Sequence, residues 1–211
     1  MISCGAVLRA AVLLLATSCA NFALADPDCP PATTPALAPA ATTGLHDADM
    51  LYLPTPHGVV TAMLRLAGVS ASDVVFDLGS GDGRIPIAAA REFGARGVGI
   101  ELDGRMIGRA RCSSRQAGTE NRVEFRQQDL YSADLREATV VTLFLFPEMT
   151  RRLGPKLLAE LRPGTRIVSH RFDLGDWRPD RTVEAAGHPL LLWTVPPSGA
   201  PVPAAPRARP R

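Results

Sequence analysis

The strongest constraint on the fold is the stretch at residues 74–84, where an apolar run leads into three glycines at alternate positions. The run closes on Asp77, and Gly79, Gly81 and Gly83 follow. Glycine permits backbone conformations with positive φ and the close approach of a ligand that a Cβ would block. The stretch therefore predicts a buried strand, a tight turn and a helix N-terminus that together form a nucleotide-type cofactor site.

The spacing of the glycines narrows the choice of cofactor. A dinucleotide-binding loop reads G-x-G-x-x-G, whereas here Arg84 directly follows the third glycine, Gly83. Asp77 would repel a pyrophosphate, but it suits a ligand with a cationic amino-acid end. The D-x-G-x-G-x-G pattern resembles motif I of the seven-stranded S-adenosyl-L-methionine (SAM) methyltransferases.

Apolar strand patterns alternate with helical patterns along the rest of the chain. Helices are predicted at residues 59–66, 85–93, 105–117 and 149–161. Strands are predicted at residues 74–78, 97–100, 123–126, 139–146 and 165–169, with a terminal antiparallel pair at 183–185 and 190–195. This order predicts a doubly wound α/β fold: a mostly parallel, seven-stranded, Rossmann-like sheet with an antiparallel edge strand.

Acidic residues stand where three of the predicted strands end. Asp77 could hold the amino end of the methionine, and Glu101 could accept both ribose hydroxyls. Asp129 could accept from the adenine amino group, with Leu130 against the ring; a surface acid beside Arg105 and a turn cap are the respective alternatives for Glu101 and Asp129. The predicted cofactor-binding residues are Asp77, Gly79, Ser80, Gly81, Gly83, Glu101, Leu102, Asp129, Leu130 and Phe146.

Several motifs in order resemble one family. They are Tyr52-Leu53-Pro54-Thr55-Pro56, the glycine loop, Gly97-Val98-Gly99-Ile100-Glu101, Pro147-Glu148-Met149 and Pro163-Gly164-Thr165-Arg166-Ile167-Val168-Ser169. Together they resemble the protein-lysine methyltransferases typified by the ATP synthase c-subunit and adenine nucleotide translocase enzymes, with their bacterial relatives. The resemblance implies SAM as cofactor and suggests a protein lysine as methyl acceptor.

Two residues are candidates for the acceptor side of the site. Glu148 could orient the acceptor amine, although an acid at a helix N-terminus can equally be explained by the macrodipole. Tyr52, with Pro54, Phe146 and Pro147, would give an apolar lining that favours a neutral amine over an ammonium. His57 and His170 are predicted to be structural, and Trp177 and Trp193 to be packing residues.

Other substrates and roles stay open. Methyl transfer requires no metal, and the sequence has no Cys/His metal spacing. A net charge of +2 and the lack of a basic patch with interleaved aromatics argue against a nucleic-acid substrate. The alternatives are a small-molecule O- or N-methyltransferase and an exported SAM-binding module without turnover. The oligomeric state is left open.

The N-terminal residues are typical of a secretory signal peptide. Arg9 precedes a short apolar run, and Ala23-Leu24-Ala25 offers a cleavage site. We expect a signal at residues 1–25, a linker at 26–49, the catalytic domain at 50–196 and a disordered tail at 197–211. The mature protein would be periplasmic; anchoring by an uncleaved N-terminus is the alternative. Cys29 and Cys112 would remain; we expect no structural disulfide, and whether these two cysteines pair is left open.

Overall fold

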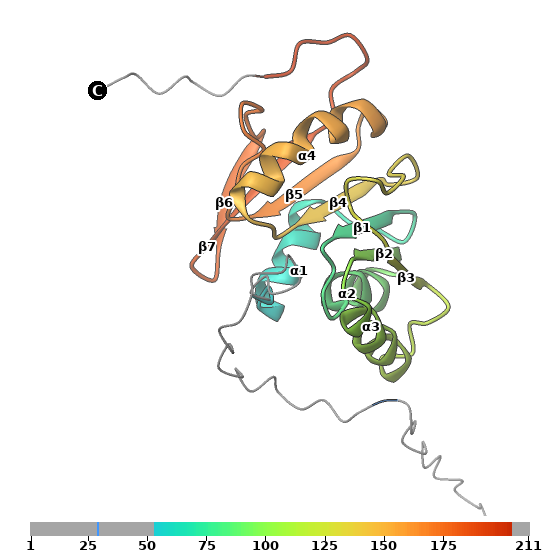
Figure 1. Cartoon of the computed structure of the whole chain (residues 1–211). Helices are drawn as coiled ribbons and strands as arrows, with labels where there is room; N and C mark the ends of the chain where they lie inside the picture. The colour runs from blue at the N-terminus through green and yellow to red at the C-terminus, as the bar shows by residue number, and fades with distance from the viewer. Residues whose placement is uncertain (1–28, 30–52, 204–211) are drawn as a thin grey trace, which may run out of the picture. The chain divides into compact units, whose positions relative to one another are not determined.

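The computed structural model describes Cys29 and residues 53–203 of the 211-residue chain (Figure 1). The predicted signal peptide, most of the predicted linker and Tyr52 lie outside the described residues. The described part contains one sheet with the strand order β3-β2-β1-β4-β5-β7-β6. Its strands are β1 (Val74–Leu78), β2 (Arg96–Glu101), β3 (Val123–Gln127), β4 (Val140–Leu143), β5 (Arg166–His170), β6 (Arg181–Ala185) and β7 (His188–Thr194).

The sheet is parallel from β3 to β5 and antiparallel at the other end. β7 pairs antiparallel with β5, and the edge strand β6 pairs antiparallel with β7. The predicted doubly wound sheet and its terminal antiparallel pair are therefore confirmed.

Helices cover both faces of the sheet, as Figure 1 shows. They are α1 (His57–Leu66), α2 (Arg84–Phe93), α3 (Gly104–Gln116) and α4 (Pro147–Glu160). Apolar residues of α1 and α2 pack with Val75, Val140 and Val168 on one face. Leu153 and Leu157 of α4 pack on the other face, together with Phe76 and the two tryptophans. Both tryptophans are buried, which confirms their predicted packing role.

The fourth strand is shorter than its apolar run predicts. The strand was predicted at residues 139–146, but β4 ends at Leu143, opposite Leu78 of β1. β1 ends at Leu78, so Phe144 has no partner on that side. Pro147 begins α4, and a residue before proline is held in an extended conformation, as Phe146 is with ψ 151°. Residues 144–146 therefore leave the sheet and form its carboxyl-end rim.

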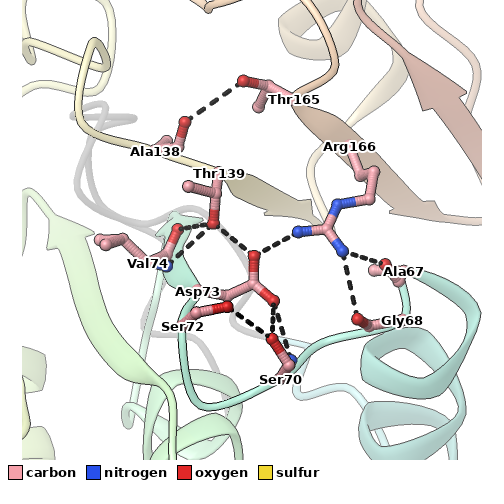
Figure 2. A network of polar contacts seen from close by, with 10 residues as sticks. All are labelled: Ala67, Gly68, Ser70, Ser72, Asp73, Val74, Ala138, Thr139, Thr165 and Arg166. Carbon is pink, nitrogen blue, oxygen red and sulfur yellow. Dashed lines mark hydrogen bonds and ion pairs between the residues drawn. The ribbon is translucent and has the colours of Figure 1, made fainter.

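A polar network joins α1 to the amino ends of β1, β4 and β5 (Figure 2). The buried Asp73 carboxylate forms an ion pair with Arg166, accepts from Thr139 Oγ1 at 2.7 Å, and accepts from the Ser70 amide at 2.8 Å. Arg166 also donates to the carbonyl oxygen of Ala67, just after α1, at 2.8 Å. The network therefore holds α1 against the amino ends of these strands, at the end of the sheet opposite the glycine loop.

Two expectations outside the sheet can be compared with the structure. Cys29 and Cys112 are each disulfide-bonded, so the expectation of no structural disulfide is wrong. In the predicted tail, the Pro203 carbonyl accepts from the Arg178 amide at 2.8 Å, and residues 204–211 lie outside the described residues. Among the described residues, no helix is long and apolar enough to cross a bilayer.

Candidate active site

The predicted site residues converge where the strand order reverses. β1 lies between β2 and β4, so the chain winds outward in both directions from the β1–β4 pair. In such sheets, ligands bind in the crevice beyond the carboxyl ends of the strands at this switch point. Asp77 near the end of β1, the glycine loop and residues 144–148 all lie at this edge.

The glycine loop has the backbone conformation that its sequence predicts. Gly79, Gly81 and Gly83 all have positive φ, at 79°, 52° and 79°. The amides of Gly79 and Ser80 donate to the Ile100 carbonyl oxygen at 2.9 and 3.0 Å, which ties the loop to β2. Gly83 then caps the N-terminus of α2.

Gly79, Ser80 and Gly83 have different roles in the loop. A Cβ on Gly83 would lie 2.5 Å from Phe125 Cζ, so this glycine serves helix–sheet packing. Ser80 Oγ is buried without a hydrogen-bond partner among the described residues, and a Cβ on Gly99 would lie 2.6 Å from it. The Ser80 side chain thus faces β2, so only its backbone remains to meet a ligand. Gly79 is exposed at the edge of the sheet, as a cofactor contact requires.

Asp77 is buried at the end of β1 and has one strong partner. Its Oδ1 accepts from Thr142 Oγ1 of the neighbouring strand β4 at 2.8 Å. Burial raises the pKa of Asp77 to about 7, with further increases from Asp82 and Glu101, against the lowering effects of Thr142 and Arg84. A carboxyl group with this pKa would be ionised more fully by a cationic ligand group placed beside it.

Glu101 ends β2 with its carboxylate fixed by backbone amides. Oε2 accepts from the Gly81 amide at 2.9 Å, and Oε1 accepts from Leu102 and Asp103 at 2.8 and 2.9 Å. Each carboxylate oxygen has two lone-pair directions, so Oε1 is filled and Oε2 keeps capacity for one ligand hydroxyl. Glu101 does not form the surface ion pair with Arg105 that was its alternative role. Arg105 pairs instead with Asp103, which caps the N-terminus of α3.

The other predicted cofactor contacts lie around the same rim. Asp129 is exposed after β3, and its Oδ1 accepts from the Tyr131 amide at 2.9 Å, which is the turn cap considered as its alternative role. Leu130 is buried in the core, whereas Leu102 and Phe146 are 65% and 45% exposed. Two apolar side chains exposed beside the glycine loop are consistent with contact to an adenine or a methionine chain. The adenine contact of Asp129 stays a prediction.

Of the predicted catalytic pair, one residue can be placed. Glu148 is exposed in the first turn of α4, close along the chain to Phe146. Tyr52 lies outside the described residues. Two surface depressions, of about 730 Å³ beside α4 and about 660 Å³ between α1 and β6, contain none of the predicted site residues. The described residues hold no group of three or more His, Cys, Asp and Glu that could bind a metal.

Sequence reasoning missed the partners of these residues. Thr142 contacts Asp77 from 65 positions away, and Arg84 donates to the Thr55 carbonyl oxygen at 2.8 Å. His170 and His188 face each other with Nε2 and Nδ1 2.9 Å apart. Pairing of neighbouring strands brings Thr142 to Asp77 and His188 to His170, whereas Thr55 and Arg84 meet through the packing of the segment before α1. No local sequence motif predicts these contacts.

The residues present fit SAM. The loop glycines adopt positive φ, and a Cβ on Gly79 would lie 2.7 Å from Leu145 Cδ2, so the close approach of the loop to residue 145 requires glycine there. Glu101 offers an oriented carboxylate for a ribose, and Asp77 offers one for an ammonium group. The exposed Leu102 and Phe146 supply apolar contact.

Comparisons with known proteins agree with this geometry. The family model described as the ANTKMT methyltransferase domain matches residues 77–181. A protein-lysine N-methyltransferase of Saccharolobus islandicus is 42% identical over 68% of this chain and 92% of its own. The adenine nucleotide translocase lysine N-methyltransferase of Mus musculus is 43% identical over 49% of this chain and 45% of its own.

One solved structure is similar to this chain over nearly all of its own length. The crystal structure of an RNA methyltransferase from Salinibacter ruber in complex with S-adenosyl-L-homocysteine is 54% identical to this chain, with a TM-score of 0.69. The match covers 71% of this chain and 97% of that one. The chain thus spans nearly all of the archaeal and bacterial relatives but less than half of the mouse enzyme.

Proposed function

Because the chain belongs to the ANTKMT methyltransferase family and is a SAM-dependent methyltransferase, we propose that it methylates the side-chain amine of a lysine in a protein. The observation that carries the proposal is the 42% identity to a protein-lysine N-methyltransferase over 92% of that enzyme. The acids and glycines of the cofactor site stand in place at the switch point of the sheet, which supports a protein that binds SAM over a remnant that does not.

SAM, when bound, supplies a methyl group on a sulfonium, which is an activated leaving group. The protein's own residues then have to orient the cofactor, align the acceptor and exclude water. Asp77 and Glu101 would orient the two ends of the cofactor, because both carboxylates are held in place by hydrogen bonds before any ligand binds. Holding these groups in advance reduces the ordering required on binding.

The acceptor amine must reach the site without its proton. A free lysine amine has a pKa of about 10.4, and an apolar environment lowers it by disfavouring the charged form. Phe146 and Pro147 provide such surface at the start of α4, and the exposed Glu148 follows them. Glu148 would accept a hydrogen bond from the amine and orient its lone pair.

Labelling with SAM tests the acceptor. The purified protein is incubated with methyl-labelled SAM and separate protein, RNA and small-molecule fractions of its host, and labelled protein is hydrolysed to amino acids. We expect label in methylated lysine. A Glu148→Gln enzyme should turn over more slowly with little change in SAM affinity, whereas Glu120→Gln, at the opposite edge of the sheet, serves as the matched control.

RNA is the second candidate acceptor. It is favoured by one observation, the 54% identity to a protein described as an RNA methyltransferase. The same experiment separates the two proposals, because label in RNA with none on protein lysine would contradict lysine methylation. Label confined to small molecules would contradict both.

We also propose that the mature protein is exported to the periplasm. The signal-like residues 1–25 support this, although they lie outside the described residues. The disulfide-bonded state of Cys29 and Cys112 gives independent support, because disulfides persist chiefly in oxidising compartments. Anchoring by an uncleaved N-terminus remains the alternative and would leave the same domain on the outer side of the membrane.

A further inference from the structure

A second cluster of polar and aromatic side chains lies at the carboxyl end of β5, outside the cofactor contacts described above. Its centre is His170, the last residue of β5, which is 1% exposed. A buried histidine requires hydrogen-bond partners, and its position at the same sheet edge as Asp77 calls for an explanation.

His170 is held from two sides through its ring nitrogens. Its Nε2 lies 2.9 Å from Nδ1 of His188 on β7, so one nitrogen donates and the other accepts. On the other side, Nδ1 is 3.5 Å from Thr55 Oγ1, a long hydrogen bond. Burial lowers the pKa of His170 to about 4, with smaller contributions from His188 and Arg171, so the ring is neutral at pH 7.

Aromatic rings and a strained backbone surround this histidine. The Phe144 ring lies 4.0 Å from the His170 ring, centroid to centroid, and stacks on Phe172 at 6.5 Å. Arg171, directly after His170, has a φ of 76°, which is uncommon for a residue other than glycine. Such strain clusters at functional sites, where the surrounding structure enforces it.

The cluster is connected to the glycine loop. Thr55 contacts His170 through its hydroxyl, and its carbonyl oxygen accepts from Arg84 Nη1 at 2.8 Å. The same guanidinium pairs with Asp82 of the glycine loop at 2.6 Å. The segment before α1 is therefore fastened at one point to the cofactor side and at another to the end of β5.

Phe144 belongs to the rim that α4 and Glu148 share. It follows β4 immediately, and it is partly exposed while His170 beneath it is buried. An acceptor could therefore contact the Phe144 ring, and the buried His170 ring packs against the inner side of that ring. On the proposed lysine methylation, this rim faces the approaching amine.

We propose that His170 is a positioning residue for the acceptor site, which holds the Phe144 ring and the Thr55 segment as the wall against which the lysine side chain aligns. This inference rests on the proposed function. A neutral histidine suits the task, because it can stack on an aromatic ring while one nitrogen accepts and the other donates. The contact with His188 constrains the tautomers of the two rings together, because one of the facing nitrogens must donate and the other accept.

Two pairs of variants test the proposal. His170→Phe keeps a buried ring against Phe144 and removes both hydrogen bonds, whereas His170→Gln keeps an amide that can reach His188. Thr55→Val removes the hydroxyl at nearly constant shape, and Thr55→Ser keeps it. We expect His170→Phe, which loses both hydrogen bonds, to lower kcat/KM for the protein acceptor by about tenfold or more, and Thr55→Val, which loses only the long one, to lower it less. Thr55→Ser and His170→Gln should recover most of it.

The measurements separate positioning from a general loss of structure. Kinetics use methyl-labelled SAM at saturation and graded concentrations of the host protein fraction, and SAM affinity is measured by calorimetry. Each variant should bind SAM within about twofold of wild type and keep a cooperative thermal transition. His57→Gln, an exposed histidine at the start of α1, is the matched control and should change nothing.

Two results would overturn the inference. One is an unchanged kcat/KM for the acceptor in both His170→Phe and Thr55→Val; the other is a loss of SAM affinity equal to the loss of kcat/KM. A wild-type enzyme that labels no protein lysine would instead contradict the proposed function. In that case nitrogen NMR of the histidine rings still decides: one fixed His170 tautomer that becomes mixed in His188→Asn supports the positioning, and a mixed tautomer in wild type refutes it.

Discussion

Glu101 holds its carboxylate with three backbone amides before any ligand arrives. One of them belongs to Gly81, so the glycine loop and the carboxylate orient each other. A ribose that binds here meets acceptors already fixed in position, which lowers the ordering cost of binding. The residue thus links the loop conformation to cofactor recognition.

Replacing Glu101 with alanine should weaken SAM binding by about 1.5–3 kcal/mol, the scale of one hydrogen bond to a charged group. Glu101→Gln should lose less, because one oxygen can still accept. Isothermal calorimetry with SAM checks both, with Glu120→Ala as the exposed control at the far edge of the sheet. Wild-type affinity in Glu101→Ala would show that the ribose lies elsewhere.

Asp77 should make SAM binding depend on pH near neutrality. Its pKa is raised to about 7, chiefly by burial, so the carboxyl group is mostly protonated at pH 6 and mostly ionised at pH 8. An ionised carboxylate binds an ammonium more tightly, so affinity should rise across this interval and a proton should be released at the lower pH. Calorimetry in buffers of different ionisation enthalpy measures that proton.

Two variants test the assignment to Asp77. Asp77→Asn should bind SAM more weakly and flatten the pH profile between 6 and 8. Thr142→Val removes the hydrogen bond that lowers the pKa, so it should shift the rise to higher pH. A rise that survives in Asp77→Asn would assign the titration to another group.

Residue roles could be predicted where a local motif carries them. The acids at the strand ends and the glycines follow from the sequence, because strand, loop and helix are adjacent in the chain. Thr142 and His170 could not be assigned, since their partners Asp77 and Thr55 lie 65 and 115 positions away. The direction of the Ser80 side chain, which lies 2.6 Å from a Cβ placed on Gly99, was likewise not predictable from the loop sequence, and its cofactor contact stays a prediction.

At the scale of elements, the Asp73–Arg166 ion pair stabilises the amino ends of the strands, which lie at the opposite end of the sheet from the cofactor site (Figure 2). The pair joins the end of α1 to the starts of β1 and β5, and Thr139 adds β4. Removing Arg166 leaves the buried Asp73 carboxylate without its ion-pair partner, and removing Asp73 leaves the half-buried Arg166 without its carboxylate. The network therefore acts on stability, away from the cofactor edge.

Asp73→Asn and Arg166→Gln should each lower the free energy of unfolding by about 2–4 kcal/mol. Urea titration measures this, with Arg136→Gln as a control whose exposed ion pair should contribute little. SAM affinity should stay unchanged in the variants that remain folded. A loss no larger than that of Arg136→Gln would refute the structural role of the pair.

The same network predicts a pH dependence of stability. Thr139, Ser70 and Arg166 lower the pKa of Asp73 although burial acts against them. A carboxyl group with a lowered pKa stabilises the folded state above its unfolded pKa of about 3.9, and this contribution is lost as the pH falls through the folded value. The acid limb of stability should therefore be shallower in Asp73→Asn, as unfolding curves at several pH values would show.

The helices and strands could be predicted because apolar residues recur with a clear period in each segment. The positions at which the strands end were harder to predict. The apolar run at residues 139–146 cannot reveal that β1 ends at Leu78 and leaves Phe144 without a partner. The insertion of β7 between β5 and β6 likewise depends on tertiary pairing rather than on local sequence. Those two features underlie the proposed acceptor side of the site.

At the scale of the whole molecule, the SAM site and the disulfide-bonded cysteines indicate different cellular compartments. The domain is a SAM-dependent methyltransferase, whereas Cys29 and Cys112 are disulfide-bonded and residues 1–25 resemble a secretory signal. A cytosolic protein would keep both thiols reduced. Export would place the enzyme with proteins of the periplasm as its acceptors.

We expect the protein isolated from the periplasmic fraction to begin at Asp26, by N-terminal sequencing, because cleavage after Ala23-Leu24-Ala25 fits the small-residue rule. That product keeps Cys29 and Cys112 and loses the two earlier cysteines, so it should show no free thiol until it is reduced. Thiol titration with and without reductant, followed by peptide mapping of the unreduced protein, measures this. Protein found only in the cytoplasm, with Met1 retained and both thiols free, would contradict export.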